Sequence, residues 1–112
     1  MGLKIHVEVY IAAHLLARDA GAFTPEELRH EIERRFGDKR SGVATHISAH
    51  CVANAPKNAA VISNYLWRLP DGRLRPFNPA TDRPHPDRVG ARTEPARTDV
   101  PAQYRGLLTA PR

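Results

Sequence analysis

The hydrophobic positions near the start of the chain fit one face of a helix better than an alternating strand. The positions that share this face are Ile5, Val9, Ala12 and Leu16. An alternating pattern covers only residues 5–11, whereas the helical pattern continues to Ala20 through residues with good helix propensity. Gly21 then stands where a helix commonly ends. We therefore predict a first helix over residues 5–20.

A second helix has a clear start signal at Thr24. Pro25 follows at the first helical position, and Glu27 stands at the third, which is the pattern of a capping box. The apolar positions around and within this helix are Phe23, Leu28, Ile32 and Phe36. Phe23 and Leu28 form the pair expected of a hydrophobic staple. The pattern predicts that the helix ends before Gly37.

A third helix is predicted over residues 42–54, with Ser41 as its cap. One face would carry Val43, Ile47, Cys51 and Asn54. The opposite face would carry Thr45, Ser48, Ala49 and Val52. This second face has short side chains and almost no charge, unlike an ordinary solvated face. Such a helix can approach a partner closely.

A basic hairpin follows, with strands predicted at 62–69 and 73–78. Residues 70–72, Pro-Asp-Gly, are typical of a three-residue hairpin loop with glycine in the left-handed conformation. The predicted cross-strand pairs are Leu69 with Arg73, Arg68 with Leu74, and Trp67 with Arg75. Arginine opposite tryptophan can stack on the ring. Alternation leaves open whether the Tyr65, Trp67 and Phe77 face or the Leu66 and Leu74 face is buried.

The composition changes after Phe77, because six of the ten prolines lie in residues 78–112. Proline at this density disfavours regular structure. The chain is therefore predicted to consist of a domain over residues 1–78 and an extended arm over 79–112. The arm could bind DNA through its arginines, act as a tail, or clasp a protein partner or the second subunit of a homodimer. Its candidate DNA contacts are Arg83, Arg88, Arg92 and Arg97. Its last apolar cluster, Tyr104, Leu107 and Leu108, could dock back on the domain or on a partner.

Positive charge is concentrated in the middle of the chain. Residues 39–77 hold six Lys or Arg and one acid, a net charge of +5, whereas residues 1–38 sum to −2 and residues 78–112 to +2. Such a block is typical of a surface for a polyanion, although it also fits a solvated basic face. No run approaches the roughly 20 apolar residues of a membrane span. A cytoplasmic protein without a membrane interaction is expected.

The candidate chemistry does not favour an enzyme, a metal site or a cofactor. His46 and His50 have the i, i+4 spacing of zinc ligands, but no glutamate follows the first histidine as it does in metalloproteases. Cys51 is the only cysteine, which excludes an intrachain disulfide, and its apolar helix face predicts an inert thiol. A catalytic Ser–His–Asp pattern and a phosphate-binding glycine loop are both lacking.

The order helix, helix, helix, basic hairpin predicts an α+β winged helix-turn-helix. In that architecture the third helix enters the major groove of DNA and the hairpin wing contacts the backbone. Short side chains on the helix permit hydrogen bonds to bases and contacts with thymine methyl groups. The predicted DNA-binding residues are Lys39, Arg40, Ser41, Thr45, His46, Ser48, Ala49, Val52, Lys57, Arg68, Arg73 and Arg75.

The segments TPEELRHEIERRF, THISAHCVANAP and YLWRLPDGRLRPF together resemble a family of small prokaryotic winged-helix domains. Those domains occur alone, classed as regulators, and attached to restriction-type nucleases. The segments DRPHPDRVGARTEP and VPAQYRGLL resemble the proline-rich extension of some stand-alone members. The resemblance covers residues 5–108 and implies a DNA-binding fold. This chain carries no recognisable nuclease motif.

Double-stranded DNA is thus the expected partner, in the role of a transcriptional regulator or an accessory DNA-recognition subunit. Two other hypotheses use different parts of the chain. A winged helix can serve as a protein-interaction module, with the short-side-chain helix face and residues 104–108 against a partner. Alternatively, Trp67 and Tyr65 could stack on the bases of a single strand.

Overall fold

The computed structural model describes residues 3–37, 43–57 and 62–108, which form a mixed α+β fold. The elements, in chain order, are α1 (Ile5–Ala20), α2 (Pro25–Phe36), α3 (Val43–Thr45), a π-helical turn η1 (His46–His50), β1 (Leu66–Arg68), β2 (Leu74–Pro76), and the 3-10 helices η2 (Pro86–Arg88), η3 (Arg97–Asp99) and η4 (Ala102–Leu107). Within these residues, no helix is long and apolar enough to cross a membrane.

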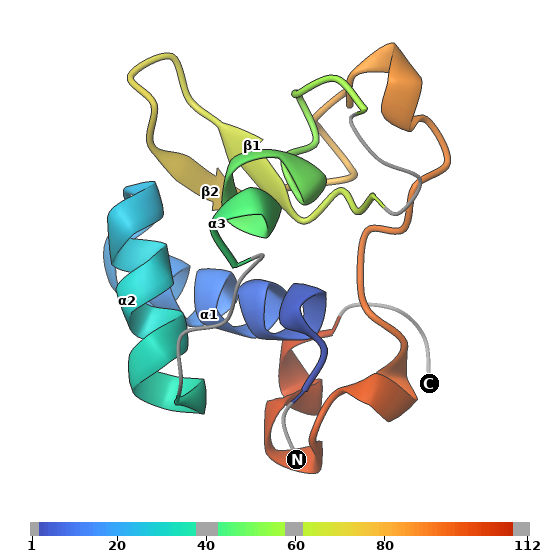
Figure 1. The fold of residues 1–112 in the computed structure, drawn as a ribbon. Coiled ribbons are helices and arrows are strands. Elements are labelled where there is room, and N and C mark those ends of the chain that lie inside the picture. The colour runs from blue at the N-terminus through green and yellow to red at the C-terminus, as the bar shows by residue number, and fades with distance from the viewer. Residues whose placement is uncertain (1–2, 38–42, 58–61, 109–112) are drawn as a thin grey trace.

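Helix α1 lies at the centre of the molecule, with α2 across it, α3 in front and the hairpin above (Figure 1). Its bounds match the prediction. Its buried side chains form much of the core and include Val7, Val9, Tyr10, Ile11, Ala12 and Ala13. Because other elements cover α1 on several sides, its burial extends beyond a single stripe.

The predicted capping box at the start of α2 is confirmed. The Thr24 N–H donates to Glu27 Oε1 over 2.7 Å, and the Glu27 N–H donates to Thr24 Oγ1 over 3.0 Å. Leu28 and Ile32 are buried against the core, and Phe36 packs at its edge. The start of α2 thus follows from a local signal, and its apolar face packs against the core.

The third helix is shorter than predicted, because it ends at His50 and not at residue 54. The Cys51 carbonyl accepts hydrogen bonds from the Leu66 N–H (2.8 Å) and the Tyr65 N–H (3.2 Å). The Ala53 N–H in turn donates to the Leu66 carbonyl over 2.7 Å. Residues 51–53 thus pair with β1, and this pairing replaces the last helical turn.

The prediction that Val52 faces outward is wrong. Val52 forms a parallel bridge with Leu66, and its side chain is fully buried. It cannot meet a thymine methyl group from this position.

The register of the hairpin is confirmed, although both strands are shorter than predicted. Trp67 pairs with Arg75, and Arg68 pairs with Leu74. Leu74 lies on the inner face, where its N–H donates to the Phe23 carbonyl over 2.7 Å. Both faces left open by the sequence contribute to the core, because Tyr65 and Phe77 are buried along with Leu66 and Leu74, whereas Trp67 is only half-buried.

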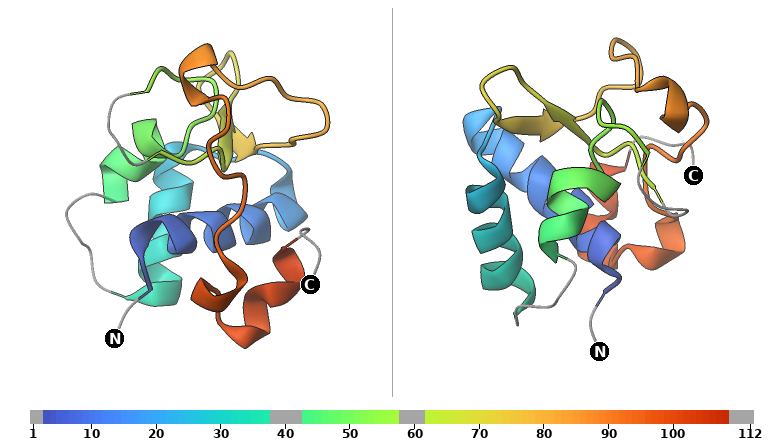
Figure 2. Two further views of the ribbon diagram at one scale, coloured as in Figure 1. Left: turned by 90° about the vertical axis from the view of Figure 1, so that its right-hand side faces the viewer. Right: turned by 45° about the horizontal axis from the view of Figure 1, so that its top comes forward.

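The described C-terminal segment, residues 79–108, packs against the rest of the protein and does not extend away as predicted. It runs from the hairpin down past α1 and forms three 3-10 helices on the way (Figure 2). Val100 and Leu108 belong to the same buried cluster as the α1 side chains. The core therefore includes residues on both sides of the predicted boundary at residue 78.

Candidate functional site

Helix α3 turns short side chains outward. Val43 and Ile47 are buried, whereas Ala44 and Thr45 are exposed. A shallow pocket of about 240 Å³ lies between α3 and α2. It is lined by Pro25, Glu26, Arg29, Ala44 and Ile47. The predicted separation of an inner and an outer face therefore holds at residues 43–47.

Several predicted contacts lie outside the described residues. These are Lys39, Arg40 and Ser41, together with the side chains of Ser48 and Ala49. Lys57 is exposed at the end of the second described range, and its backbone N–H donates to Asp87 Oδ2 over 3.4 Å.

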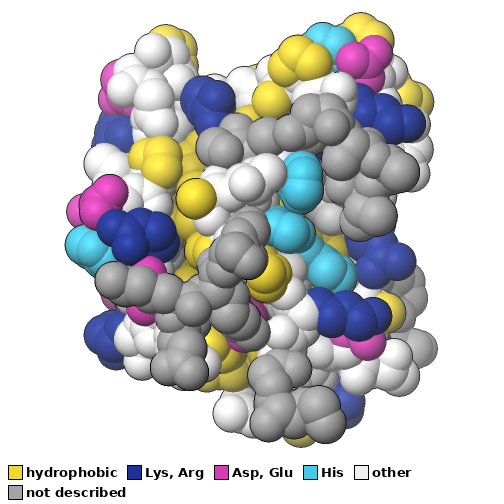
Figure 3. All heavy atoms as spheres, viewed as in Figure 1, with side chains coloured by type: hydrophobic (Ala, Val, Ile, Leu, Met, Phe, Trp, Pro, Cys, Tyr) yellow, Lys and Arg dark blue, Asp and Glu magenta, His cyan; other side chains and the backbone are white. Residues whose placement is uncertain are grey.

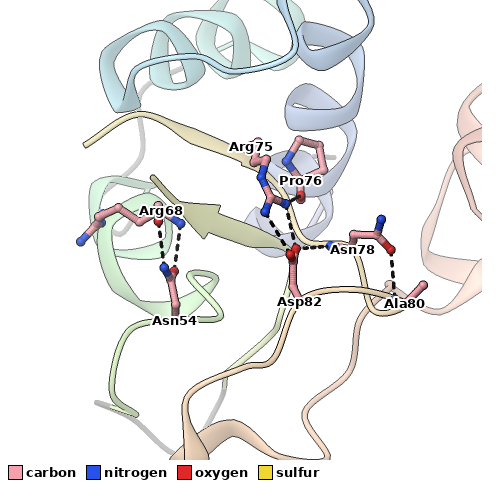
Figure 4. Close-up of polar contacts among 7 residues, drawn as sticks. All are labelled: Asn54, Arg68, Arg75, Pro76, Asn78, Ala80 and Asp82. Carbon is pink, nitrogen blue, oxygen red and sulfur yellow. Dashed lines mark hydrogen bonds and ion pairs between the residues drawn. The ribbon is translucent and has the colours of Figure 1, made fainter. Parts of the chain in front are cut away.

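Two arginines of the hairpin pair with neighbouring carboxylates. Arg73 Nε lies 2.8 Å from Asp71 Oδ2, and both side chains are about half exposed. Arg75 makes a two-pronged contact with Asp82, with distances of 2.8 and 3.0 Å (Figure 4). An exposed pair exchanges partners readily, whereas a bidentate pair with a largely buried carboxylate holds its geometry.

In the pair of Arg75 and Asp82, the carboxylate of Asp82 is held in place by further contacts. Its side chain is 8% exposed and also accepts the Asn78 N–H over 2.8 Å. The hydrogen bonds from Arg75 are the main reason that the pKa of Asp82 is lowered from its ordinary value. On the other side, the Arg75 guanidinium lies 5.5 Å from the centre of the Trp67 ring, which confirms the predicted stacking. Arg75 therefore braces the hairpin.

The third hairpin arginine, Arg68, is held through its backbone. Asn54 Nδ2 donates to the Arg68 carbonyl over 2.8 Å, and the Arg68 N–H donates to Asn54 Oδ1 over 2.9 Å (Figure 4). The half-buried Arg68 side chain lies on the face of the strand opposite Arg75, because neighbouring strand residues alternate. Asn54 thereby couples the segment after α3 to the start of the wing-like hairpin.

The structure brings together a histidine cluster that the sequence did not predict. His46 and His50 have ring centres 4.7 Å apart, and the neighbourhood of His46 is one of the causes that lower the pKa values of His50 and of His6 from α1. His6 Nδ1 lies 3.0 Å from the Tyr65 hydroxyl. Arg92 of the C-terminal segment acts on His6 as well. His6 and Arg92 are 86 positions apart in the chain, so no local pattern could have joined them.

Arg88 was a candidate DNA contact, but its side chain is fully buried. Among the described residues, its guanidinium donates to four carbonyls, those of Ala55 (2.7 Å), His50 (3.0 Å), Ser63 (3.0 Å) and Pro56 (3.5 Å). Burial lowers the pKa of Arg88 from its ordinary value, but an arginine in this position remains charged. The residue joins the end of η1 to Ala55 and to Ser63, and its charge is not available to a ligand.

Cys51 has the environment of an inert thiol. The side chain is fully buried, and burial raises its pKa to about 12. A nucleophilic or redox-active cysteine needs a lowered pKa and access to solvent. Among the described residues, no group of three or more His, Cys, Asp or Glu side chains has the arrangement of a metal site.

Each of the two alternative functions loses one of the two surfaces on which it was based. Tyr65 is 1% exposed, so it cannot stack on a nucleobase. Tyr104 packs its ring against Phe36, and Leu108 is 6% exposed. The apolar end of the C-terminal segment is therefore occupied by the protein's own α1 and α2.

Comparisons of the chain with models of protein families, with curated proteins and with solved structures found no match. The function is therefore inferred from the residues and their geometry.

Proposed function

We propose that this protein binds double-stranded DNA as a winged helix-turn-helix, and that it serves as a transcriptional regulator or an accessory DNA-recognition subunit. In this proposal α3 enters the major groove, and the hairpin lies beside it against the phosphate backbone. The order of elements and the antiparallel hairpin are compatible with this architecture.

The observation that carries the proposal is the outer side of α3. Ala44 and Thr45 are exposed there, while Val43 and Ile47 anchor the helix in the core. Short side chains let a helix approach base edges, and a threonine offers both a hydroxyl and a methyl group to them. Lys and Arg side chains occupy this face on both sides of the helix (Figure 3). Phosphates on either side of the groove would find cationic groups there.

Not every arginine of the hairpin is available to contact a phosphate. Arg75 is held by Asp82 and Trp67, whereas Arg73 can leave the exposed Asp71 for a phosphate. We therefore assign the sequence-independent contacts of the hairpin to Arg73 and Arg68, and a supporting role to Arg75.

Selection from a pool of random duplexes tests the proposal. We expect binding that weakens steeply as the salt concentration rises, because phosphate contacts release counterions. Thr45→Val keeps the shape of the side chain but removes its hydroxyl, so it should change the selected sequences more than the overall affinity.

Gln103→Ala is the matched control, because Gln103 is exposed on η4 away from α3. It should leave both affinity and sequence preference unchanged. Failure of the protein to bind any duplex at low salt would refute the proposal. Co-purification of a stoichiometric protein partner, with no nucleic acid retained, would favour the interaction-module hypothesis instead.

A further inference from the structure

We propose that His6, His46, His50 and Arg92 form a second contact surface for DNA phosphates, beside α3, whose positive charge increases as the pH falls. This inference rests on the proposed DNA binding. It adds the start of α1 and the C-terminal segment to an interface that otherwise consists of α3 and the hairpin.

The surface is assembled from three separate parts of the chain. His46 and His50 lie on the turn η1, which continues α3, and His6 lies on the first turn of α1. The Asn64 N–H donates to the Arg92 carbonyl over 2.8 Å, so the backbone that carries Arg92 is fixed next to this group. Histidine side chains gather at the middle of the face that also shows α3, with Lys and Arg side chains beside them (Figure 3).

The groups around the histidines are mainly cationic or neutral. His6 is surrounded by Lys4, Arg92, Asp99, Tyr65 and His46. His50 has His46 and Arg88 among its neighbours, and His46 is also a neighbour of His6. Asp99 is the single carboxylate among these described groups, and Lys4 Nζ lies 3.7 Å from it. A phosphate would therefore meet little competing negative charge.

The arrangement predicts the direction of the pH dependence. Burial and neighbouring cations lower the pKa values of His6 and His50, so both are mostly neutral at pH 7 and above. A bound phosphate stabilises the protonated form of each ring. DNA binding should therefore take up protons and become tighter as the pH falls. The Tyr65 hydroxyl, whose pKa burial raises to about 12, stays protonated throughout and positions the His6 ring.

Titrations of one duplex at pH 8 and pH 6, at constant ionic strength, test this inference. The duplex is taken from the random-pool selection. For the wild type we expect affinity to rise by about tenfold or more, since uptake of one proton changes affinity up to tenfold per pH unit. The variant with His6→Gln, His46→Gln and His50→Gln should lose most of this rise. Calorimetry in buffers with different ionisation enthalpies measures the proton uptake directly.

Two further variants separate the surface from general effects of charge. His30→Gln removes an exposed histidine of α2 that lies 3.4 Å from Glu26, and it should keep the wild-type pH dependence. Arg92→Gln should weaken binding at both pH values and reduce the salt slope by about one. The triple variant also removes the contact between His6 and Tyr65, which could affect folding. His46→Gln, which keeps this contact, is therefore measured as well, and thermal unfolding checks that each variant is folded.

The outcomes distinguish the two proposals. Binding that is equally tight at both pH values, or a triple variant with the wild-type pH dependence, would overturn the histidine surface and leave the DNA-binding function in place. Absence of binding to any duplex at either pH would overturn both.

Discussion

The hairpin and the C-terminal segment are both rich in arginine, but they use it differently. In the hairpin, Arg73 and Arg75 pair with carboxylates that lie two and seven residues away in the chain. In the C-terminal segment, Arg88 donates to backbone carbonyls 25 to 38 residues away. Arginine thus stabilises a local turn in the hairpin, and in the C-terminal segment it joins parts of the chain that are far apart in sequence.

This difference shows that a count of arginines does not identify a binding surface. The partner of each guanidinium decides whether its charge is available to a ligand. By that criterion Arg73, which pairs with the exposed Asp71, can reach a ligand, and the fully buried Arg88 is excluded.

Substitution of Arg88 should have the largest effect on stability. Arg88→Met leaves several buried carbonyls without a donor, and we expect a loss of at least about 3 kcal/mol in the free energy of unfolding. Urea denaturation measures this loss. Arg83→Met, at an exposed position of the same segment, is the control and should change little. Equal stability of the two variants would contradict a structural role for Arg88.

A pair of valines tests whether the C-terminal segment is part of the core. Val100 is 1% exposed and Val89 is 77% exposed. Val100→Ala should lower the free energy of unfolding by about 2 kcal/mol, because it leaves a cavity in the core. Val89→Ala should be close to wild type. Two small and similar effects would show that the segment is not firmly docked.

The pair of Arg75 and Asp82 should have a smaller, pH-dependent effect. Asp82→Asn is expected to cost about 1 kcal/mol at pH 7, because it weakens a charge-assisted contact between the largely buried Asp82 and the partly exposed Arg75. The lowered pKa of Asp82 means that this stabilisation is complete well above pH 3.8 and is lost as the pH falls below that value. Unfolding measured from pH 7 to pH 2 should therefore show the two proteins converge in acid.

Arg73→Ala should have the smallest effect on stability, because the pair with Asp71 is exposed. Its effect should appear in DNA binding, as a similar loss of affinity for all duplex sequences. Thermal unfolding and duplex titration of the same preparation measure the two effects. A change in sequence preference would place Arg73 against base edges and contradict the assignment to the backbone.

The elements that the sequence predicted well are those with local causes. The capping box of Thr24 and Glu27 and the turn at residues 70–72 act within a few residues, and the structure reproduces α1, α2 and the hairpin register. The end of α3 was missed because its hydrogen bonds go to Leu66, a residue of the hairpin. The docking of the C-terminal segment was left open by the sequence, because proline density reports the absence of regular structure and says nothing about packing.

The sequence predicted the exposed face of α3, but it did not predict which residues from other parts of the chain lie beside that face. The exposure of Thr45 followed from the helical spacing of Val43 and Ile47. The approach of His6 and Arg92 depends on tertiary contacts, and a single sequence gives no signal for it.

The buried guanidinium of Arg88 also sets an order of events during synthesis of the chain. It bonds the carbonyl of His50, which is made 38 residues earlier. At about 5–20 residues per second, roughly 2–8 seconds separate the emergence of the two residues. Helices α1 and α2 can form in that interval, but the hydrogen bond from Arg88 to the turn η1 can form only after Arg88 has been made. A nascent chain that stalls before Arg88 should therefore expose the surface around His50 to chaperones.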